Sequence, residues 1–402
     1  MKNILKISEK DCYKNLSESY LFSDVRQKVK EFSSKNKVKI LDMSIGDIAY
    51  AIPPSSAEAM RIAATEMGDN VRKRGYSPEN GYPFLLKAIT EYYADLGVKR
   101  TENEILAGDG AKSDVSLFTD ALSCRNELIQ EPCYPVYRDA AIMRGSTLSV
   151  VTGNKENGFL PLPTSIEKKP YVITLCSPNN PTGATYGKEE LKKWVDFAIE
   201  TGSLILFDGA YSAFAKQNAV KTIFSVKNAE YCAVEFGSFS KFAGFTGVRC
   251  SWVAIPEKIK LGNNKTLLSL IKRRRSATFN GVSYITQRGA EAALSFRGKK
   301  ECEALIKKYM SAAGKLKAYF AGTGLFFTGG DNCPYLFIEC PNGEKSFPFF
   351  ERLLEKTGVV CTPGVGFGEA GEGYFRLSAF QTESTVDEVI KRFKASKIFD
   401  IK

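Results

Sequence analysis

The sequence predicts an α/β protein with a large domain, in which a mostly parallel sheet lies between helices, and a smaller α+β domain built from both chain ends. The first reason is length, because 402 residues exceed what one hydrophobic core usually accommodates. The second is the alternation of short apolar runs with amphipathic helical runs through the middle of the chain, which is typical of a doubly wound sheet. The third is the alternating polarity of two runs near the C-terminus, which indicates antiparallel strands.

In the first half of the chain, the spacing of apolar residues predicts the helices and strands, and one glycine predicts where a helix ends. Residues 38–47, VKILDMSIGD, form a short β-like run behind a polar N-terminal arm. Apolar positions at helical spacing predict a helix over 83–97, which ends in glycine, and another over 115–123. A short apolar strand is predicted at 148–151.

Two buried strands and a helix between them are the clearest unit of the middle of the chain. Residues 171–177 and 203–211 are continuous apolar runs, as parallel strands buried on both faces are. Residues 188–202 are amphipathic and end at Gly202. This strand–helix–strand order predicts a parallel pair with a helical crossover.

The C-terminal part begins with a long predicted helix at 301–324, followed by antiparallel strands at 335–340 and 374–380. We therefore divide the chain into three parts. These are an N-terminal arm with part of the small domain (1–50), a large α/β domain (51–300) and the C-terminal part of the small domain (301–402).

The chain has no histidine, and this excludes several kinds of chemistry. A Ser-His-Asp triad, a histidine metal site and a histidine general base are impossible, so proton transfer must use Lys, Tyr, Asp, Glu or Cys. The ten cysteines form no CxxC pair, which predicts neither a zinc site nor a disulfide framework and favours reduced thiols in the cytoplasm. We expect no secretory signal and no membrane span.

The net charge of +11 is the one unusual feature of the composition. Its only dense basic run is KRRR at 272–275, and the other basic residues are interleaved with acidic ones, so we expect no nucleic-acid partner. The run itself is expected to be solvated or to face a dimer partner near the active-site mouth. An alternative is that it attracts a dianionic substrate.

Three apolar strands end in polar residues, at the edge where an α/β sheet places its ligands. The runs are TLCSPNNPTG, ILFDGAY and VEFGSFSK. We expect six of their side chains to converge on one crevice: Asn180, Asp208, Tyr211, Ser238, Ser240 and Lys241. Taken singly, each has another interpretation, since Asn180 is a natural turn residue, Asp208 could cap a helix and Lys241 could be a surface lysine.

Together these residue types match the needs of an aldehyde cofactor such as pyridoxal 5′-phosphate. Such a cofactor needs a lysine amine for a Schiff base, a carboxylate beside its pyridine nitrogen and donors for its phosphate. Lys241 and Asp208 would meet the first two needs, and the displaced lysine amine could act as the base that histidine cannot supply. The phosphate and the ring would be held by Ser238, Ser240, Arg249, the helix start at Ala111 and Lys112, and Tyr134.

The ordered motifs SPNNPTG, FDGAY and SFSKFAGFTGVR resemble the class I/II aminotransferases of fold-type I, which use pyridoxal phosphate. The stretches SYLF, SIGD, RGYSPENGY, GDGAKSD, EPCYPVY and TFNG are similar to those of members that act on L,L-2,6-diaminopimelate. The similarity runs from about Tyr20 to Arg376. It implies transamination of L,L-diaminopimelate with 2-oxoglutarate, which in the biosynthetic direction converts tetrahydrodipicolinate and glutamate into L,L-diaminopimelate, a precursor of lysine and cell wall. The alternatives are an aminotransferase of aspartate, alanine or aromatic amino acids, or a C–S lyase of the same fold.

The resemblance also implies a role for each matching residue, with Lys241 as the Schiff-base lysine. The other implied cofactor contacts are Tyr76, Ala111, Lys112, Tyr134, Asn180, Asp208, Tyr211, Ser238, Ser240, Arg249 and Asn280. The implied substrate contacts are Tyr20, Gly46, Lys112, Tyr134, Asn180, Asn280 and Arg376, which would grip the α-carboxylate with its bidentate guanidinium. Tyr76 and Asn280 resemble residues donated across a dimer interface, so the resemblance implies a homodimer with shared sites.

Some residues depart from the family pattern. These are the run IAYAIPPS after Asp47, Gly209 in FDGAY, and Phe242 after the lysine. They flank the expected pocket and concern substrate specificity rather than the chemistry. Two rivals come from other classes: a non-catalytic basic binding protein, and a nicotinamide dehydrogenase, for which no GxGxxG follows an early strand.

Overall fold

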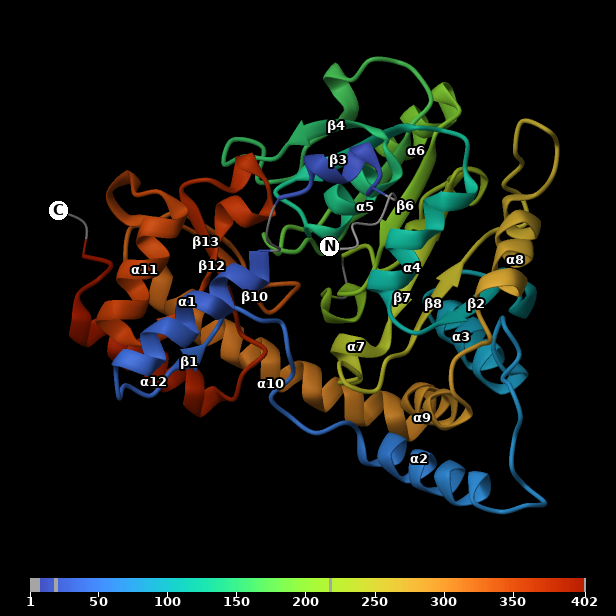
Figure 1. The fold of residues 1–402 in the computed structure, drawn as a ribbon, viewed down its shortest axis with the longest axis horizontal. Helices are drawn as coiled ribbons and strands as arrows, with labels where there is room; N and C mark the ends of the chain where they lie inside the picture. Colours follow the sequence, from blue (N-terminus) through green and yellow to red (C-terminus); the bar gives the residue numbers. More distant parts are fainter. Residues whose placement is uncertain (1–7, 18–20, 217–218, 401–402) are drawn as a thin grey trace, which may run out of the picture.

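The computed structural model describes residues 8–17, 21–216 and 219–400, and a seven-stranded sheet lies at its centre (Figure 1). The strand order is β2-β8-β7-β6-β5-β3-β4, and β8 runs in the opposite direction to the other six strands of this sheet. The predicted mostly parallel sheet is thereby confirmed. The strands are β2 (Ile105–Gly108), β3 (Asn126–Glu131), β4 (Thr147–Thr152), β5 (Val172–Cys176), β6 (Leu204–Asp208), β7 (Ala233–Ser238) and β8 (Ser251–Ala254).

Helices cover both faces of this sheet because successive side chains of its central strands point to opposite sides. Ile205 and Phe207 of β6 share one apolar cluster with Trp194 of α6. Leu206 and Phe236 lie in a different cluster, together with residues of α4. The helices of this domain are α2 (Pro54–Met67), α3 (Pro83–Asp95), α4 (Ala111–Phe118), α5 (Val136–Arg144), α6 (Lys188–Thr201), the short α7 (Phe239–Phe242), α8 (Leu267–Thr278) and α9 (Tyr284–Leu294).

A second, smaller group of elements combines both ends of the chain, as predicted. Its four-stranded antiparallel sheet has the order β12-β13-β10-β9, and a separate parallel pair joins β1 to β11. The strands are β1 (Leu41–Asp42), β9 (Phe327–Gly329), β10 (Tyr335–Glu339), β11 (Val359–Val360), β12 (Thr362–Pro363) and β13 (Tyr374–Ser378). The helices are α1 (Leu21–Lys35), α11 (Ser346–Thr357) and α12 (Glu383–Ser396), and Figure 1 shows α1 beside the C-terminal elements.

The long helix α10 (Phe296–Ala321) joins the two groups. Tyr309 belongs to the core of the large sheet, whereas Leu316 and Phe320 belong to the core of the small one. The predicted division between residues 300 and 301 falls inside this helix, and the division into domains stays a prediction.

Most predicted helices and strands are confirmed, and the differences lie at their ends, where capping residues decide the boundary. The helix expected at 83–97 is α3, followed by Gly97 at φ +76°, and the helix expected at 188–202 is α6, which Gly202 ends in the left-handed conformation. The helix expected to begin at 301 begins at Phe296 instead, because the Ser295 side chain caps it by accepting a hydrogen bond from Gly298 N at 3.1 Å.

The expectation that KRRR is wholly solvated or partner-facing is wrong for its last residue. Arg275 is buried, and its guanidinium donates to the backbone carbonyls of Glu79 and Ala107. Since backbone carbonyls cannot move away without disrupting the fold, Arg275 is a structural clamp between α8 and the end of β2.

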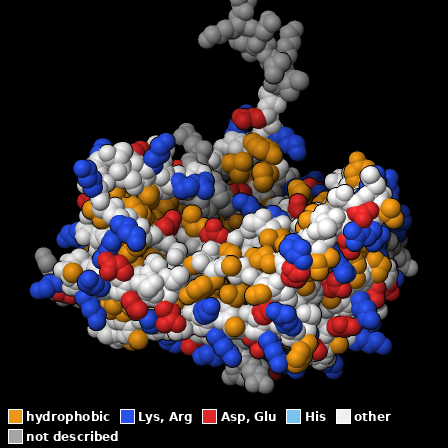
Figure 2. Space-filling view, turned by 90° about the horizontal axis from the view of Figure 1, so that it is seen from below, with side chains coloured by type: hydrophobic (Ala, Val, Ile, Leu, Met, Phe, Trp, Pro, Cys, Tyr) orange, Lys and Arg blue, Asp and Glu red, His pale blue; other side chains and the backbone are white. Residues whose placement is uncertain are grey.

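Charged side chains of both signs are interspersed over the face seen in Figure 2, with Asp and Glu lying between Lys and Arg. The excess of positive charge is therefore not gathered into one patch on that face. Among the described helices, none combines the length and the apolar character that crossing a membrane requires.

Candidate active site

A cavity of about 640 Å³ lies at the carboxyl ends of the parallel strands, between the two groups of elements. It brings together most residues that the sequence singled out: Gly46, Ala111, Lys112, Tyr134, Asn180, Asp208, Tyr211, Ser238, Ser240, Lys241, Arg249 and Arg376. Asn180 follows β5, Asp208 ends β6 and Ser238 ends β7, so adjacent parallel strands deliver them to one edge. The predicted convergence is thus observed in the structure.

Lys241 lies on the short helix α7, directly after β7, and is partly buried. The Ser238 side chain accepts a hydrogen bond from Ser240 N at 3.2 Å and so caps this turn. The Lys241 amine donates to Gly46 O and lies 5.3 Å from the centre of the Phe380 ring. Burial, followed by the nearby Arg376 charge, lowers the pKa of Lys241 to about 8. A neutral, nucleophilic amine is therefore far more populated here than at a surface lysine.

Asp208 lies buried at the floor of the cavity. Its Oδ2 accepts a hydrogen bond from Tyr137 Oη at 2.6 Å, and its Oδ1 accepts one from Ala210 N at 3.0 Å. Burial raises the pKa of Asp208, and these two hydrogen bonds oppose the rise. A cationic group placed beside this carboxylate would replace the solvation that it has lost.

Two tyrosines form one wall of the cavity. Tyr211 Oη and Tyr335 Oη lie 3.0 Å apart, and burial raises the pKa of Tyr335 to about 12, so both phenols stay protonated at neutral pH. The pair links the loop after β6 to β10 of the small sheet. Tyr134, from the loop after β3, meets the Tyr137 ring edge-on at 5.9 Å between ring centres.

Arg376 on β13 is only 1% exposed, yet it lines the cavity. Its Nη1 donates to Asn180 Oδ1 at 2.6 Å, and its Nη2 donates to Ser44 O and, at 3.3 Å, to Thr362 Oγ1. The Tyr335 ring lies 4.4 Å from its Cζ. These contacts hold the guanidinium plane in one orientation, as bidentate recognition of a carboxylate requires.

The turn interpretation of Asn180 applies instead to its neighbour. Asn179 is fully buried and donates to Pro132 O and Thr182 Oγ1, both at 3.0 Å. Asn180 holds Arg376 and faces the cavity. Local sequence could not distinguish the two asparagines because both lie in the same SPNNPTG turn.

Donors for an anion lie together at one end of the cavity. The residues Ala111 and Lys112 open α4, where backbone amides are not used by the helix itself. Arg249 donates from Nη1 to Ser240 Oγ at 3.2 Å, and Ser238 and Ser240 face the same space. We name this set, Ala111, Lys112, Ser238, Ser240 and Arg249, the anion cradle.

Sequence reasoning missed several residues that the structure places at the site. Tyr137 and Tyr335 hold Asp208 and Tyr211, and Arg26 on α1 also lines the cavity. Tyr137 could have been suspected, since it ends the EPCYPVY motif. Tyr335 and Arg26 carry no local sequence signal, because only the tertiary packing of segments far apart in the sequence places them at the cavity.

Tyr76 and Asn280 do not line the cavity of their own chain. Both are exposed, Tyr76 by 88%, and they lie on adjoining loops, since a Cβ at Gly281 would clash with the Pro78 carbonyl. Tyr20, the remaining predicted substrate contact, lies outside the described residues.

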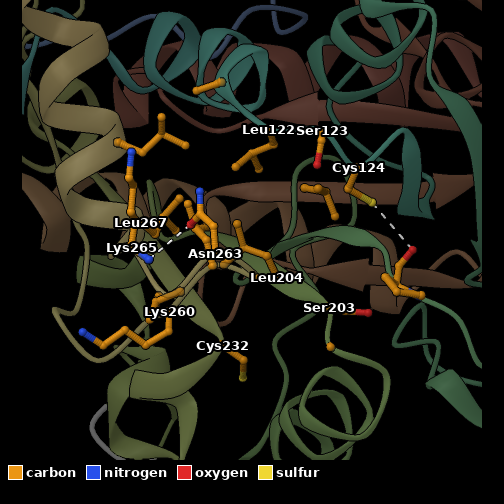
Figure 3. A pocket seen from close by; sticks show the side chains of 18 of the residues that line it. Leu122, Ser123, Cys124, Ser203, Leu204, Cys232, Lys260, Asn263, Lys265 and Leu267 are labelled. Carbon is orange, nitrogen blue, oxygen red and sulfur yellow. Dashed lines mark hydrogen bonds between the residues drawn. The ribbon is translucent and has the colours of Figure 1, made fainter.

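A larger cavity, of about 1140 Å³, lies at the opposite edge of the sheet (Figure 3). Its lining includes residues just before β5, β6 and β7, such as Ser203 and Cys232, and Lys260 and Lys265 from a neighbouring loop. None of the predicted site residues that the structure describes lines this cavity. Size alone does not make a catalytic site, and the chemistry lies at the carboxyl edge.

In this structure a doubly wound sheet presents a desolvated lysine beside an anion cradle, and a second α+β domain lies over the cavity. This is the arrangement of the pyridoxal phosphate-dependent transferases of fold-type I. The chain belongs to the family described as aminotransferase class I and II, whose model matches residues 38–393.

Similar proteins include a Prochlorococcus marinus subsp. pastoris protein named LL-diaminopimelate aminotransferase, 43% identical over 97% of this chain and 99% of that protein. A Bacteroides thetaiotaomicron protein of the same name is 42% identical over 94% and 97%. A solved structure, L,L-diaminopimelate aminotransferase from Chlamydomonas reinhardtii, superposes with a TM-score of 0.91 at 33% identity, covering 97% of this chain and 99% of that one. These matches confirm the family resemblance, the fold class and the pyridoxal phosphate chemistry expected from the motifs.

Proposed function

We propose that this protein transfers an amino group between L,L-2,6-diaminopimelate and 2-oxoglutarate, in the cell running toward L,L-diaminopimelate from tetrahydrodipicolinate and glutamate. The observation that carries the chemistry is the single cavity in which Lys241, Asp208, the anion cradle and Arg376 meet. The choice of substrate is supported by relatives that bear the name LL-diaminopimelate aminotransferase and match nearly the whole chain. No observation favours the aspartate, alanine or aromatic alternatives or a C–S lyase.

The residues present fit pyridoxal 5′-phosphate. The anion cradle suits its phosphate, the buried Asp208 carboxylate suits a protonated ring nitrogen, and Tyr211 and Asn180 suit its phenolic oxygen. Tyr134 supplies an aromatic side chain at the same site. When bound, the cofactor supplies an electron sink that stabilises negative charge developing at the substrate α-carbon.

Lys241 is the residue that transfers the proton of the substrate α-carbon. Its amine would hold the cofactor through the aldehyde carbon, and it would be free for proton transfer once an amino substrate has displaced it. The released amine, whose pKa of about 8 leaves a larger neutral fraction than an ordinary lysine has, accepts the proton of the substrate α-carbon. Gly46 O, which accepts from this amine in the structure, holds it at the cavity wall.

Arg376 and Asn180 orient the substrate. The guanidinium, held by Asn180 and Thr362, binds the α-carboxylate with two parallel hydrogen bonds. A substrate with a second carboxylate meets Lys112 on the large-domain wall and Arg26 on α1. Those additional cations fit a dicarboxylic substrate such as 2-oxoglutarate better than a simple aliphatic one.

The active form is a homodimer in this proposal. Tyr76 and Asn280 lie together on adjoining exposed loops, outside their own cavity, which suits residues that complete a neighbouring chain's site. Their role in cofactor and substrate binding is thus assigned across the interface. The ten free thiols fit a reducing compartment, so we place the enzyme in the cytoplasm.

The rate at which the cofactor-free protein captures pyridoxal phosphate should follow the titration of Lys241. The lowered pKa means that the amine loses its proton as pH rises through about 8 rather than near the ordinary lysine value of 10.5. The capture rate, followed by stopped-flow absorbance, should therefore rise from pH 6 and level off above about 8. A rate that keeps rising beyond pH 10 would show an ordinary lysine.

The substrate assignment is tested by amino-donor profiling with 2-oxoglutarate as acceptor. We expect L,L-diaminopimelate to be the best donor by kcat/KM, with aspartate, alanine and phenylalanine at least roughly 100-fold poorer, because site polar groups left unpaired by the wrong substrate cost several kcal/mol. Glutamate formation is the readout. If one of the other amino acids were the best donor, the corresponding alternative would replace this assignment while the transaminase chemistry stood.

A further inference from the structure

Two glycines, one at the end of β2 and one just before α4, leave room for charged side chains. A Cβ at Gly108 would overlap the carboxylate of Asp114, and a Cβ at Gly110 would overlap the guanidinium of Arg249. Gly110 also has φ +142°, which other residues rarely adopt. The backbone before α4 therefore lies directly against a carboxylate and a guanidinium. Arg249 belongs to the anion cradle, whereas Asp114 has no role assigned so far.

Asp114 lies in the first turn of α4 and is joined to the helix start through one serine. Ser251 Oγ donates to Asp114 Oδ2 at 2.5 Å, and Gly110 N donates to Ser251 Oγ at 2.8 Å. Asp114 N in turn donates to Gly110 O at 3.2 Å. Because Ser251 pairs with Gly108 in the β2–β8 register, the serine is anchored to the same strand end. The result is a closed ring of hydrogen bonds beneath the first amides of the helix.

Two guanidinium groups act on the Asp114 carboxylate. Burial raises its pKa to about 6, while the Ser251 hydrogen bond and the charges of Arg275 and Arg249 pull the pKa down. Asp114 is thus ionised at neutral pH. The charge of Arg275, the structural clamp, and the smaller effect of Arg249 in the cradle both act on it, and Asp114 itself does not line the cavity.

We propose that Asp114 is a positioning residue for the anion cradle: through Ser251 it fixes the Gly110 amide and the helix start that follows, where the phosphate would bind. The inference rests on the proposed function, since the phosphate is that of the cofactor. It gives Asp114 an effect on phosphate binding and none on the reaction of the Lys241 amine.

The test compares two cofactor forms that differ only in the phosphate. Full-length Asp114→Asn and Ser251→Ala proteins, freed of cofactor, are titrated with pyridoxal phosphate and with pyridoxal, and capture by Lys241 is followed by absorbance. Loss of one charge-assisted hydrogen bond should weaken pyridoxal phosphate binding roughly 10- to 100-fold in each variant, with pyridoxal binding changed less than about twofold. The ³¹P resonance of the bound phosphate should shift in both variants.

The two substitutions break one chain of contacts, so the double variant should lose little more affinity than either single variant. Asp120→Asn is the matched control, because Asp120 lies on the surface just after α4 and pairs with Arg274 at 3.3 Å; it should bind both forms normally. If Asp114→Asn fails to fold, Ser251→Ala alone carries the test.

Unchanged pyridoxal phosphate affinity in the folded variants, or an equal loss for pyridoxal, would overturn the role of Asp114. In that case transamination by the unaltered protein would leave the proposed function standing. Failure of the unaltered protein to capture either form would instead overturn the proposed function and this inference together.

Discussion

Replacing Lys241 by alanine is expected to lower transamination by at least roughly 10⁴-fold, because the substitution removes the nucleophile and the general base at once. The chain should still fold. Burial and the neighbouring Arg376 charge disfavour the Lys241 ammonium, so its loss removes an unfavourable group. The measurements are steady-state kinetics with L,L-diaminopimelate and thermal unfolding of the cofactor-free protein.

Lys272→Ala provides the matched control for that variant. Lys272 is also a partly buried lysine whose pKa is lowered by burial, but it lies on α8, away from the cavity, and donates to Asn103. It should keep nearly full activity. Substantial turnover by Lys241→Ala, with cofactor attached to another lysine, would remove Lys241 from its role.

Replacing Arg376 by lysine should lower kcat/KM by roughly 10- to 100-fold for the amino acid and for the keto acid alike, since a lysine keeps the charge but loses the two-pronged hydrogen bond. Both substrates carry the same α-carboxylate, so both half-reactions should suffer. Loss should appear mainly as a raised KM. Covalent attachment of the cofactor to Lys241 should persist, which separates substrate binding from cofactor binding.

Arg392→Lys is the control for the arginine variant. Arg392 donates to two backbone carbonyls, Lys39 O at 2.7 Å and Thr357 O at 3.0 Å, in the small domain and away from the cavity. It should change stability slightly and kinetics hardly at all. An Arg376→Lys protein with normal KM values for both substrates would show that another cation binds the α-carboxylate.

The parts of the site that could be predicted from sequence are those delivered by strand ends. Asn180, Asp208 and Lys241 each follow a short apolar run, and the parallel arrangement of β5, β6 and β7 obliges them to meet at one edge. The helix ends at Gly97 and Gly202 were predictable for a similarly local reason, the left-handed conformation that glycine adopts.

The parts that could not be predicted depend on contacts between distant segments. Tyr335 reaches Tyr211 across 124 residues, and the Ser251–Asp114 pair joins residues 137 apart. β1 was expected as a run of ten residues but has only two, because its pairing partner β11 is equally short. Arg275 belongs to a basic run that local sequence predicts to be solvated, and only the fold brings to it the distant carbonyls that accept its hydrogen bonds.

Amino-group transfer through Lys241 can be measured directly as the change in the absorbance spectrum of the purified holoenzyme during titration with L,L-diaminopimelate, without any keto acid. We expect an initial absorbance band of cofactor attached to Lys241, which is lost stoichiometrically as the amino group is transferred and is restored by 2-oxoglutarate with release of one glutamate per site. A spectrum without that band, or a band that L,L-diaminopimelate leaves unchanged, would show that this protein does not transfer the amino group of L,L-diaminopimelate through Lys241.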